Sequence, residues 1–162
     1  MARIVLGTAD TVAGSVYGTI VVMGAITVGA GGALDPWRLA SAVAATVIVL
    51  WLTHVYSHGL GESIGRGRQL EREELIAIAR RELAIPLAAV APLVALFLGG
   101  IGLLRETSAV WLALGLGLAI LAVQGFRYAA LEHLGGRDTA KGVAVNLALG
   151  LGIIAMKVAV AH

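Results

Sequence analysis

TSAVWLALGLGLAILAVQGF, residues 107–126, is a stretch without a single Asp, Glu, Lys or Arg. A helix rises about 1.5 Å per residue, so roughly 20 apolar residues cross the hydrocarbon core of a bilayer. Similar uncharged stretches cover residues 11–34, 39–61 and 83–104, and residues 142–162 contain a single Lys. These stretches predict an all-α, polytopic membrane protein with five transmembrane helices.

The composition of the 162-residue chain fits this class. Hydrophobic residues make up 59% and charged residues only 14%, whereas soluble domains commonly have about a quarter of their residues charged. We therefore expect one transmembrane domain over residues 1–162, surrounded by the lipid bilayer. The chain has no Cys, which excludes disulfides and thiolate metal sites. The predicted spans are residues 11–34, 39–61, 83–104, 107–127 and 141–161.

Basic residues are concentrated in alternate connections between these spans. The second connection carries Arg66, Arg68, Arg72, Arg80 and Arg81, the fourth carries Arg127, Arg137 and Lys141, and the first and third carry Arg38 and Arg105. By the positive-inside rule, the second and fourth connections are cytoplasmic. The N-terminus is then cytoplasmic and the C-terminus outside, as expected for a multi-pass protein of the cell membrane. No basic face with interleaved aromatic residues predicts a nucleic-acid partner.

Local signals predict where some helices begin. Asp35 followed by Pro36 is typical of an N-cap and the first helical position. Residues 69–82 alternate charged and apolar side chains at helical spacing, which predicts a short amphipathic helix at the cytoplasmic interface. The residues that can cap the fourth and fifth spans are Thr107, Ser108, Asp138 and Thr139.

His54, His58 and Glu62 are the first candidate site. Their spacing of four residues puts all three on one face of the second span. Imidazole and carboxylate groups together suit Zn, Fe, Mn or Ni, and His residues relay protons near neutral pH. Alternatively, His58 and Glu62 lie among lipid headgroups and only His54 is buried.

Asp10 opens the first span and is a candidate metal ligand or, alternatively, a helix N-cap. Tyr17 follows on the same span and can reach a polar partner. Gln124 and Asn146 are polar residues in the fourth and fifth spans. We expect them either to bond to a neighbouring helix or to line a transport pathway.

Small residues at a spacing of four predict close helix packing. Gly14 and Gly18 show this spacing in the first span, and Gly150 follows Asn146 by four residues in the fifth. The face of Gly14 and Gly18 is our candidate for a contact between subunits.

The chain resembles the vacuolar iron transporter family in its predicted topology and in short motifs. Residues 4–10, IVLGTAD, resemble the family's LGANDG entry into the first span, with Asp10 on its aspartate. Residues 54–57, HVYS, fall where the family has a GEYVS-like stretch and keep its tyrosine, Tyr56. Residues 124–142 resemble the family's turn from the fourth to the fifth span.

The resemblance implies a dimer that exports Fe(II) or Mn(II) from the cytosol, often in exchange for protons. Asp10 is then a metal or proton site, and His54 and His58 replace carboxylates that the family has and this chain lacks. Tyr56 joins the candidate pathway. The residues left for a cytoplasmic metal-capture surface are Glu62, Glu71, Glu73 and Glu74.

Together these observations predict a small transporter, not an enzyme, with an inward-facing polar site for a divalent cation or protons. No nucleophile–base pair or phosphate-binding loop is apparent, although a haem with histidine ligands is conceivable. The first alternative is a structural or accessory protein that holds a partner complex. The second is a cation channel lined by hydroxyl groups.

Overall fold

The computed structural model describes residues 9–31 and 35–160, and every regular element in these residues is a helix. The predicted all-α class is therefore confirmed. The helices are α2 (Ala9–Gly31), α3 (Pro36–Arg66), α4 (Arg72–Arg81), α5 (Ala84–Gly100), α6 (Glu106–Leu131) and α7 (Gly136–Val160).

Four of these helices, α2, α3, α6 and α7, are long and apolar enough to cross a membrane. The fifth predicted span corresponds to α5, which has only 17 residues and is about 25 Å long. It reaches a spanning length if α4 and α5, bent by 46° at their junction, count as one broken span. The long apolar helices indicate a membrane protein with four or five spans.

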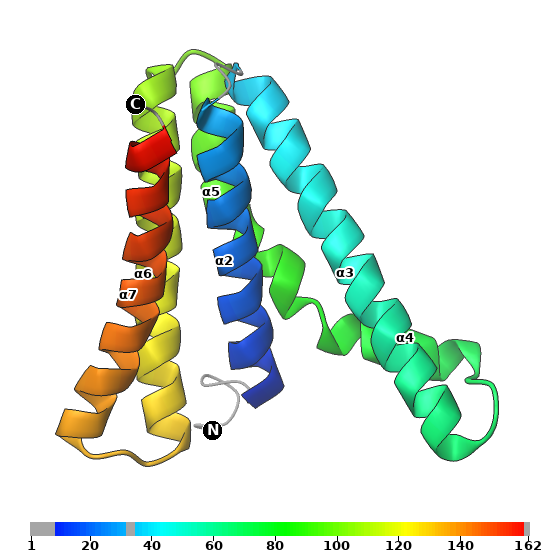
Figure 1. The fold of residues 1–162 in the computed structure, drawn as a ribbon. Coiled ribbons are helices and arrows are strands. Elements are labelled where there is room, and N and C mark those ends of the chain that lie inside the picture. Colours follow the sequence, from blue (N-terminus) through cyan, green and yellow to red (C-terminus); the bar gives the residue numbers. More distant parts are fainter. Residues whose placement is uncertain (1–8, 32–34, 161–162) are drawn as a thin grey trace.

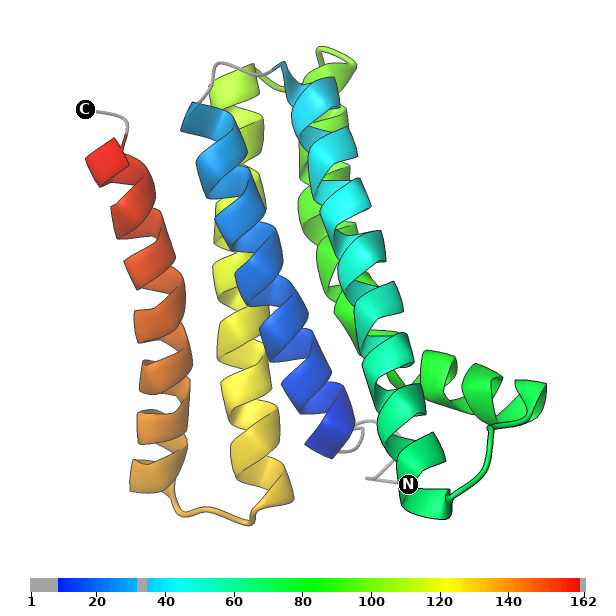
Figure 2. The ribbon, with the colours of Figure 1, turned by 45° about the vertical axis from the view of Figure 1, so that its right-hand side comes forward.

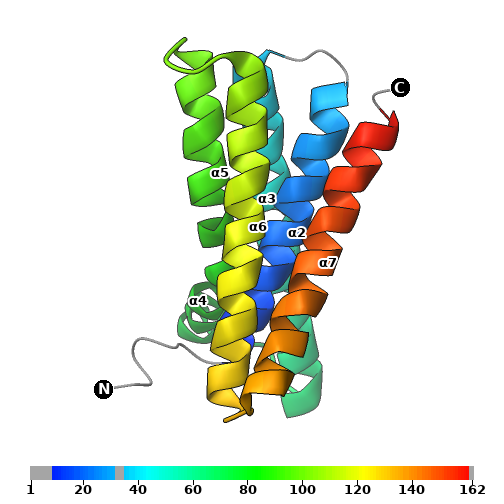
Figure 3. The same cartoon turned by 90° about the vertical axis from the view of Figure 1, so that its left-hand side faces the viewer.

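The helices form a bundle around α2, which contacts α3, α5, α6 and α7. In Figure 1, α6 and α7 lie on one side of α2 and α3 on the other. Figure 2 shows α4 projecting sideways from the lower end of α3, and Figure 3 shows α6 running beside α7. The start of α2 and the connections 67–71 and 132–135 lie at one end, which we call the basic end because arginines flank both connections.

The hydrophobic core lies where α2, α5 and α6 meet. Met23 and Ile26 of α2, Leu96 of α5, and Leu114 and Leu121 of α6 are fully buried. In the most apolar window of each helix, 44% of the residues are buried in α2 but only 17% in α3 and 11% in α7. The outer faces of α3 and α7 are therefore left for the surrounding medium.

The start of α3 follows the predicted capping pattern. The Asp35 carboxylate accepts from the backbone N–H groups of Trp37 and Arg38, and Pro36 is the first helical residue. The helix continues five residues past its predicted end and stops where Gly67 adopts the left-handed conformation, with φ of 62°. Glycine has the lowest cost in that conformation, so this residue sets the end of α3.

Three predicted caps are wrong. Asp10 is not an N-cap, because α2 already begins at Ala9 and Asp10 lies in its first turn, where a carboxylate favours the helix dipole. The fourth predicted span begins at Glu106, so neither Thr107 nor Ser108 caps it. The fifth begins at Gly136, which leaves Asp138 and Thr139 inside its first turn. Residues 1–8, which carry most of the LGANDG-like motif, lie outside the described residues.

The small residues of α2 pack within the chain. A Cβ on Gly18 would lie 2.6 Å from the Ile85 carbonyl oxygen, and one on Gly14 would lie 3.2 Å from the Ala84 Cβ. The face of Gly14 and Gly18 is thus covered by α5, and our candidate subunit contact there is wrong. Gly150 of α7 packs in the same way on α6, where its Cβ would lie 2.8 Å from Leu118 Cδ1.

Candidate functional site

A polar cavity of about 450 Å³ lies between the first turns of α2, the C-terminal half of α3 and the junction of α4 with α5. In Figure 1, the helix α3 and the junction of α4 with α5, which border this cavity, lie to the right of the lower half of α2. We call it the polar cavity. Its polar lining residues are Asp10, Tyr17, His54, His58, Arg81 and Glu82.

The closest polar contact in the cavity joins His58 to Glu82. The His58 Nδ1 lies 2.9 Å from the Glu82 Oε1, and the Glu82 side chain is only 10% exposed. Burying a carboxylate is costly unless it is paired. A second cation helps to meet this cost, because the Arg81 Nε lies 3.5 Å from the same oxygen. The short break between α4 and α5 therefore anchors Glu82 against α3.

His54 lies one turn before His58 and contacts α2. Its Nδ1 is 3.1 Å from the Leu50 carbonyl oxygen, and its ring centroid is 4.9 Å from that of Tyr17. The two imidazole rings are 6.0 Å apart and nearly perpendicular. Tyr17 thus connects the first span to the histidine face of the second.

The hydrogen bonds of the two histidines select which nitrogen remains available. A carbonyl only accepts, so the Nδ1 of His54 carries the proton in its bond to Leu50. The Nδ1 of His58 donates to the Glu82 carboxylate in the same way. In the neutral form, each Nε2 then keeps a lone pair. Metal-binding histidines commonly have this arrangement, with the second nitrogen fixed by a carboxylate or a backbone carbonyl.

The structure brings together four of the sequence-predicted residues: Asp10, Tyr17, His54 and His58 all line the polar cavity. Glu62, which the helical spacing grouped with the histidines, does not line it. Its two carboxylate oxygens lie 2.9 Å from Arg66 Nη2 and 3.4 Å from Arg81 Nη2.

The other predicted pathway residues lie elsewhere. Tyr56 is 70% exposed on the opposite side of α3 and lines a separate hollow. Gln124 is buried and its Nε2 donates to Ser15 Oγ at 2.8 Å, which joins α6 to α2. Asn146 donates from Nδ2 to the Leu121 carbonyl oxygen at 3.2 Å, which joins α7 to α6. These amides make the interhelical bonds that are typical of polar residues in membrane helices.

Glu82 and Arg81 line the cavity although the sequence did not predict them as site residues. Both belong to the charged segment that predicts an interfacial helix, and nothing in its periodicity separates them from their neighbours. One signal was available: Glu82 is the last charged residue before the apolar run 83–104. A charged residue at such a boundary lies where a surface helix meets a buried one.

The positions of the potential metal-binding side chains limit how a metal ion can bind. Among residues 9–31 and 35–160, no three His, Asp or Glu side chains lie close enough together to hold an ion. An ion held by two side chains keeps water molecules as its remaining ligands, as Mg²⁺ commonly does in proteins. The cavity as it stands therefore suits a partly hydrated cation or a proton.

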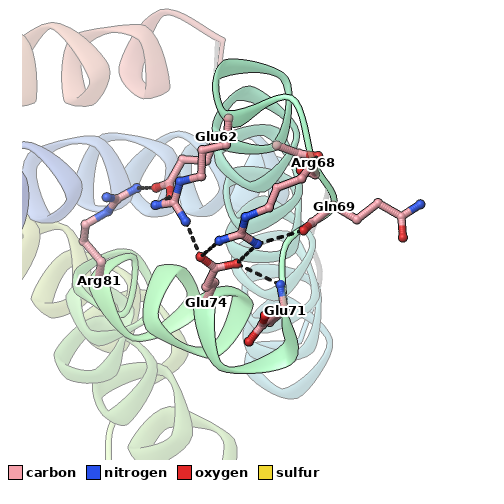
Figure 4. A network of polar contacts seen from close by, with 8 residues as sticks. Glu62, Arg68, Gln69, Glu71, Glu74 and Arg81 are labelled. Carbon is pink, nitrogen blue, oxygen red and sulfur yellow. Dashed lines mark hydrogen bonds and ion pairs between the residues drawn. The ribbon is translucent and has the colours of Figure 1, made fainter.

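A network of ion pairs fastens α4 to the end of α3, as Figure 4 shows. Arg66 and Arg68 both pair with the Glu74 carboxylate, which also accepts from the backbone N–H of Glu71 at 2.8 Å. Arg81 continues the network through Glu62 to the polar cavity. The carboxylates of Glu62 and Glu74 are therefore occupied by arginines, which argues against a metal-capture surface formed by them.

The same contacts lower the pKa of Glu74 from 4.5 to about 2, mainly through its hydrogen bond with Arg68 and then through that with the Glu71 backbone. A carboxyl whose pKa is lowered by folding stabilises the folded state above its unfolded pKa. We expect this contribution to be complete above about pH 4.5 and to be lost as the pH falls toward 2.

Thermal unfolding of wild type and Glu74→Gln between pH 2 and pH 6 measures this dependence. The melting temperature of wild type should exceed that of the variant at pH 6, and the difference should shrink toward pH 2. Glu73→Gln removes the neighbouring exposed carboxylate and should melt like wild type throughout. A difference for Glu74→Gln that stays constant down to pH 2 would contradict the assignment.

Comparison of the chain with protein-family models, curated proteins and solved structures gave no match, so the resemblance to vacuolar iron transporters stays a prediction.

Proposed function

We propose that this protein is a small membrane transporter that binds a divalent cation in the polar cavity and exchanges it for protons. One observation carries the proposal: Asp10, His54, His58 and Glu82 come from three separate segments and line one open cavity. Ionisable groups within membrane-spanning helices are costly and commonly mark ion or proton pathways.

The donor atoms support a cation of the Fe, Mn or Zn type as the cargo. The Nε2 atom of a neutral imidazole and a carboxylate oxygen are ligands that such ions accept, and two side chains of the cavity, one of them His54 or His58, bind the ion in this proposal. Arg81 does not compete for them directly, because its guanidinium is held by Glu82 and Glu62. Water molecules complete the coordination shell.

Proton exchange follows from the same ligands. A histidine must be neutral to bind a metal ion, so cation binding releases protons from protonated imidazoles. His58, paired with Glu82 in the lining of the cavity, can accept a proton when the cation leaves. Cation and protons then alternate at one site, which is the requirement for exchange.

The orientation is also part of the proposal. Arginines flank both connections at the basic end, so the positive-inside rule assigns this end to the cytoplasm. In this proposal α5 alone is the fifth span, since its 17 residues are at the short end of the range that can cross a bilayer, and α4 lies at the interface. The N-terminus is then cytoplasmic and the C-terminus outside, in a multi-pass protein of the cell membrane. We also propose that the protein is a homodimer. Five short helices enclose little interior, so a transport pathway would involve the interface between two subunits. That interface is a surface other than the Gly14 and Gly18 face, which α5 covers.

Flux measurements in proteoliposomes test the proposal. Liposomes that contain wild-type protein and a metal-sensitive dye should take up Mn²⁺ faster than empty liposomes, and a pH gradient should change the rate. Asp10→Ala and His54→Ala should each slow the uptake. Glu106→Gln should not, because Glu106 is the first residue of α6 and this helix begins at the opposite end of the bundle. Unchanged uptake in both cavity variants would refute the site.

The two alternatives give different outcomes in the same preparation. A cation channel would show single-channel currents. A structural or accessory protein would show neither flux nor bound metal and would co-purify with a partner complex.

A further inference from the structure

A second cavity, of about 700 Å³, lies on the other side of α2, between α2, α6 and α7. Its walls are mainly aliphatic and come from all three helices, for example Val16, Leu131 and Val145. Cavities of roughly 300–1,000 Å³ with apolar walls and a few polar groups are typical small-molecule sites. We call it the tyrosine cavity, after Tyr17 and Tyr128 in its lining.

The charged residue that lines this cavity is acidic. Glu132 lines it, and within the described part of the chain no basic side chain forms a salt bridge with the Glu132 carboxylate. The basic residues nearest to Glu132 in the sequence, apart from His133, are Arg127 and Arg137, each five residues away, followed by Lys141. Among the described residues no salt bridge joins Arg137 to Glu132. The Lys141 Nζ lies 2.8 Å from Asp138, and the Arg127 Nη1 donates to Gln124 at 3.2 Å.

The aromatic rings add a second preference for cations. Tyr17 and Tyr128 are 41% and 48% exposed, so their rings remain accessible. The Tyr128 ring lies against α7, since a Cβ on Gly142 would be 3.6 Å from its Cδ1. The face of a tyrosine ring attracts a cation, and aromatic residues are the usual recognition elements for quaternary ammonium groups.

Asn146 supplies a neutral acceptor in the same cavity. Its Nδ2 donates to the Leu121 carbonyl oxygen, so the amide oxygen remains able to accept from a ligand. The lining thus combines a carboxylate, accessible tyrosines, an amide oxygen and aliphatic walls. A metal ion would gain nothing from the aliphatic walls, and a neutral lipid chain would gain nothing from Glu132.

We propose that the tyrosine cavity binds a lipophilic organic monocation, of the quaternary ammonium or phosphonium class. Glu132 supplies the countercharge, and Tyr17 and Tyr128 supply the ring faces. This site goes beyond the proposed transport of a divalent cation and does not depend on it, because its charged residue, Glu132, lies outside the polar cavity. Tyr17 lines both cavities, and its ring centroid lies 4.9 Å from that of His54, so a bound organic cation contacts the residue that borders the metal ligands.

Calorimetric titration of the full-length protein in detergent with tetraphenylphosphonium tests the inference, with triphenylphosphine oxide as the neutral probe. Wild type should bind the cation and bind the neutral probe at least about tenfold more weakly, equivalent to about 1.4 kcal/mol. Glu132→Gln, which keeps the side-chain shape, should weaken cation binding by about tenfold and leave the neutral probe unaffected. Glu106→Gln is the matched control and should bind like wild type.

Two substitutions of Tyr128 separate the ring from its hydroxyl group. Tyr128→Leu should weaken cation binding by about two- to fivefold, whereas Tyr128→Phe should keep it. Glu132 and Tyr128 are both exposed, so these variants should fold, and their melting temperatures check this. Equal affinity for the two probes, or wild-type affinity in Glu132→Gln, would overturn the proposal. If the wild-type protein binds tetraphenylphosphonium but carries no Mn²⁺ flux, the proposed transport is wrong and the organic-cation site stands.

Discussion

Gly18→Ala is expected to lower the free energy of unfolding by about 3 kcal/mol, the upper end of the usual cost of overpacking. The added Cβ would lie 2.6 Å from the Ile85 carbonyl oxygen and 3.0 Å from its Cα. Both atoms belong to the backbone, so no side-chain rotation relieves the contact. The helices α2 and α5 must move apart, and the polar cavity that they border is disturbed with them. Unfolding in mixed micelles, followed by circular dichroism, measures the loss.

Gly24→Ala is the matched control on the same helix. No atom lies within 4 Å of a Cβ at this position. Alanine is a better helix former than glycine by about 1 kcal/mol, so this variant should be as stable as wild type or more stable. If the two variants unfold alike, the close approach of α2 and α5 is wrong.

Glu82→Gln is expected to weaken cation binding by about 10- to 100-fold, as is typical when the partner of a metal-binding histidine is changed. Glutamine has the same length but no charge, so the His58 Nδ1 loses its anionic acceptor at 2.9 Å. The imidazole is then free to turn or to change tautomer, and Mn²⁺ uptake should also lose its dependence on the pH gradient. The apparent Mn²⁺ affinity in proteoliposomes, measured at several pH values, tests both effects.

Glu62→Gln separates this role from a general effect on the charged network. Glu62 pairs with the same Arg81 but lies outside the polar cavity. This variant should transport Mn²⁺ with an affinity close to that of wild type. Equal losses in the two variants would mean that Glu82 acts only by holding α4 in position.

Much of the fold was predictable because charge is so unevenly distributed along the chain. The uncharged runs coincide with helices, since an apolar segment in a bilayer must satisfy its backbone hydrogen bonds internally. The exact helix ends were less predictable. The helix α3 continues to Arg66 and α7 begins at Gly136, because helices extend past the apolar run until a residue such as Gly67 stops them.

The candidate site was only partly predictable, and its residues show why. His54 and His58 share a face of one helix, and that relation follows from their spacing alone. The spacing also assigned Glu62 to the same site, whereas Arg66, one turn later on α3, and Arg81 of α4 hold its carboxylate outside the cavity. Glu82 reaches the cavity only because α4 and α5 bend by 46° at their junction, and local periodicity does not encode that bend.

Helix packing was the least predictable part. Gly14 and Gly18 indicated that another helix approaches closely, but the pattern does not say which one. The approaching helix is α5 of the same chain rather than a second subunit. In the same way, the sequence left both a packing role and a ligand role open for Gln124. Its bond to Ser15, 109 residues away, decides for packing.

Anomalous diffraction from crystals soaked in Mn²⁺, recorded at the manganese edge, tests the central claim most directly. The account predicts one strong peak in the polar cavity, within coordination distance of the Nε2 of His54 or His58 and near Asp10. The same peak should disappear in His54→Ala crystals and persist in Glu62→Gln crystals. An empty cavity alongside strong peaks at Glu71 or Glu73 would contradict the account, because the ion would then bind the surface of α4 instead of the site between α2 and α3.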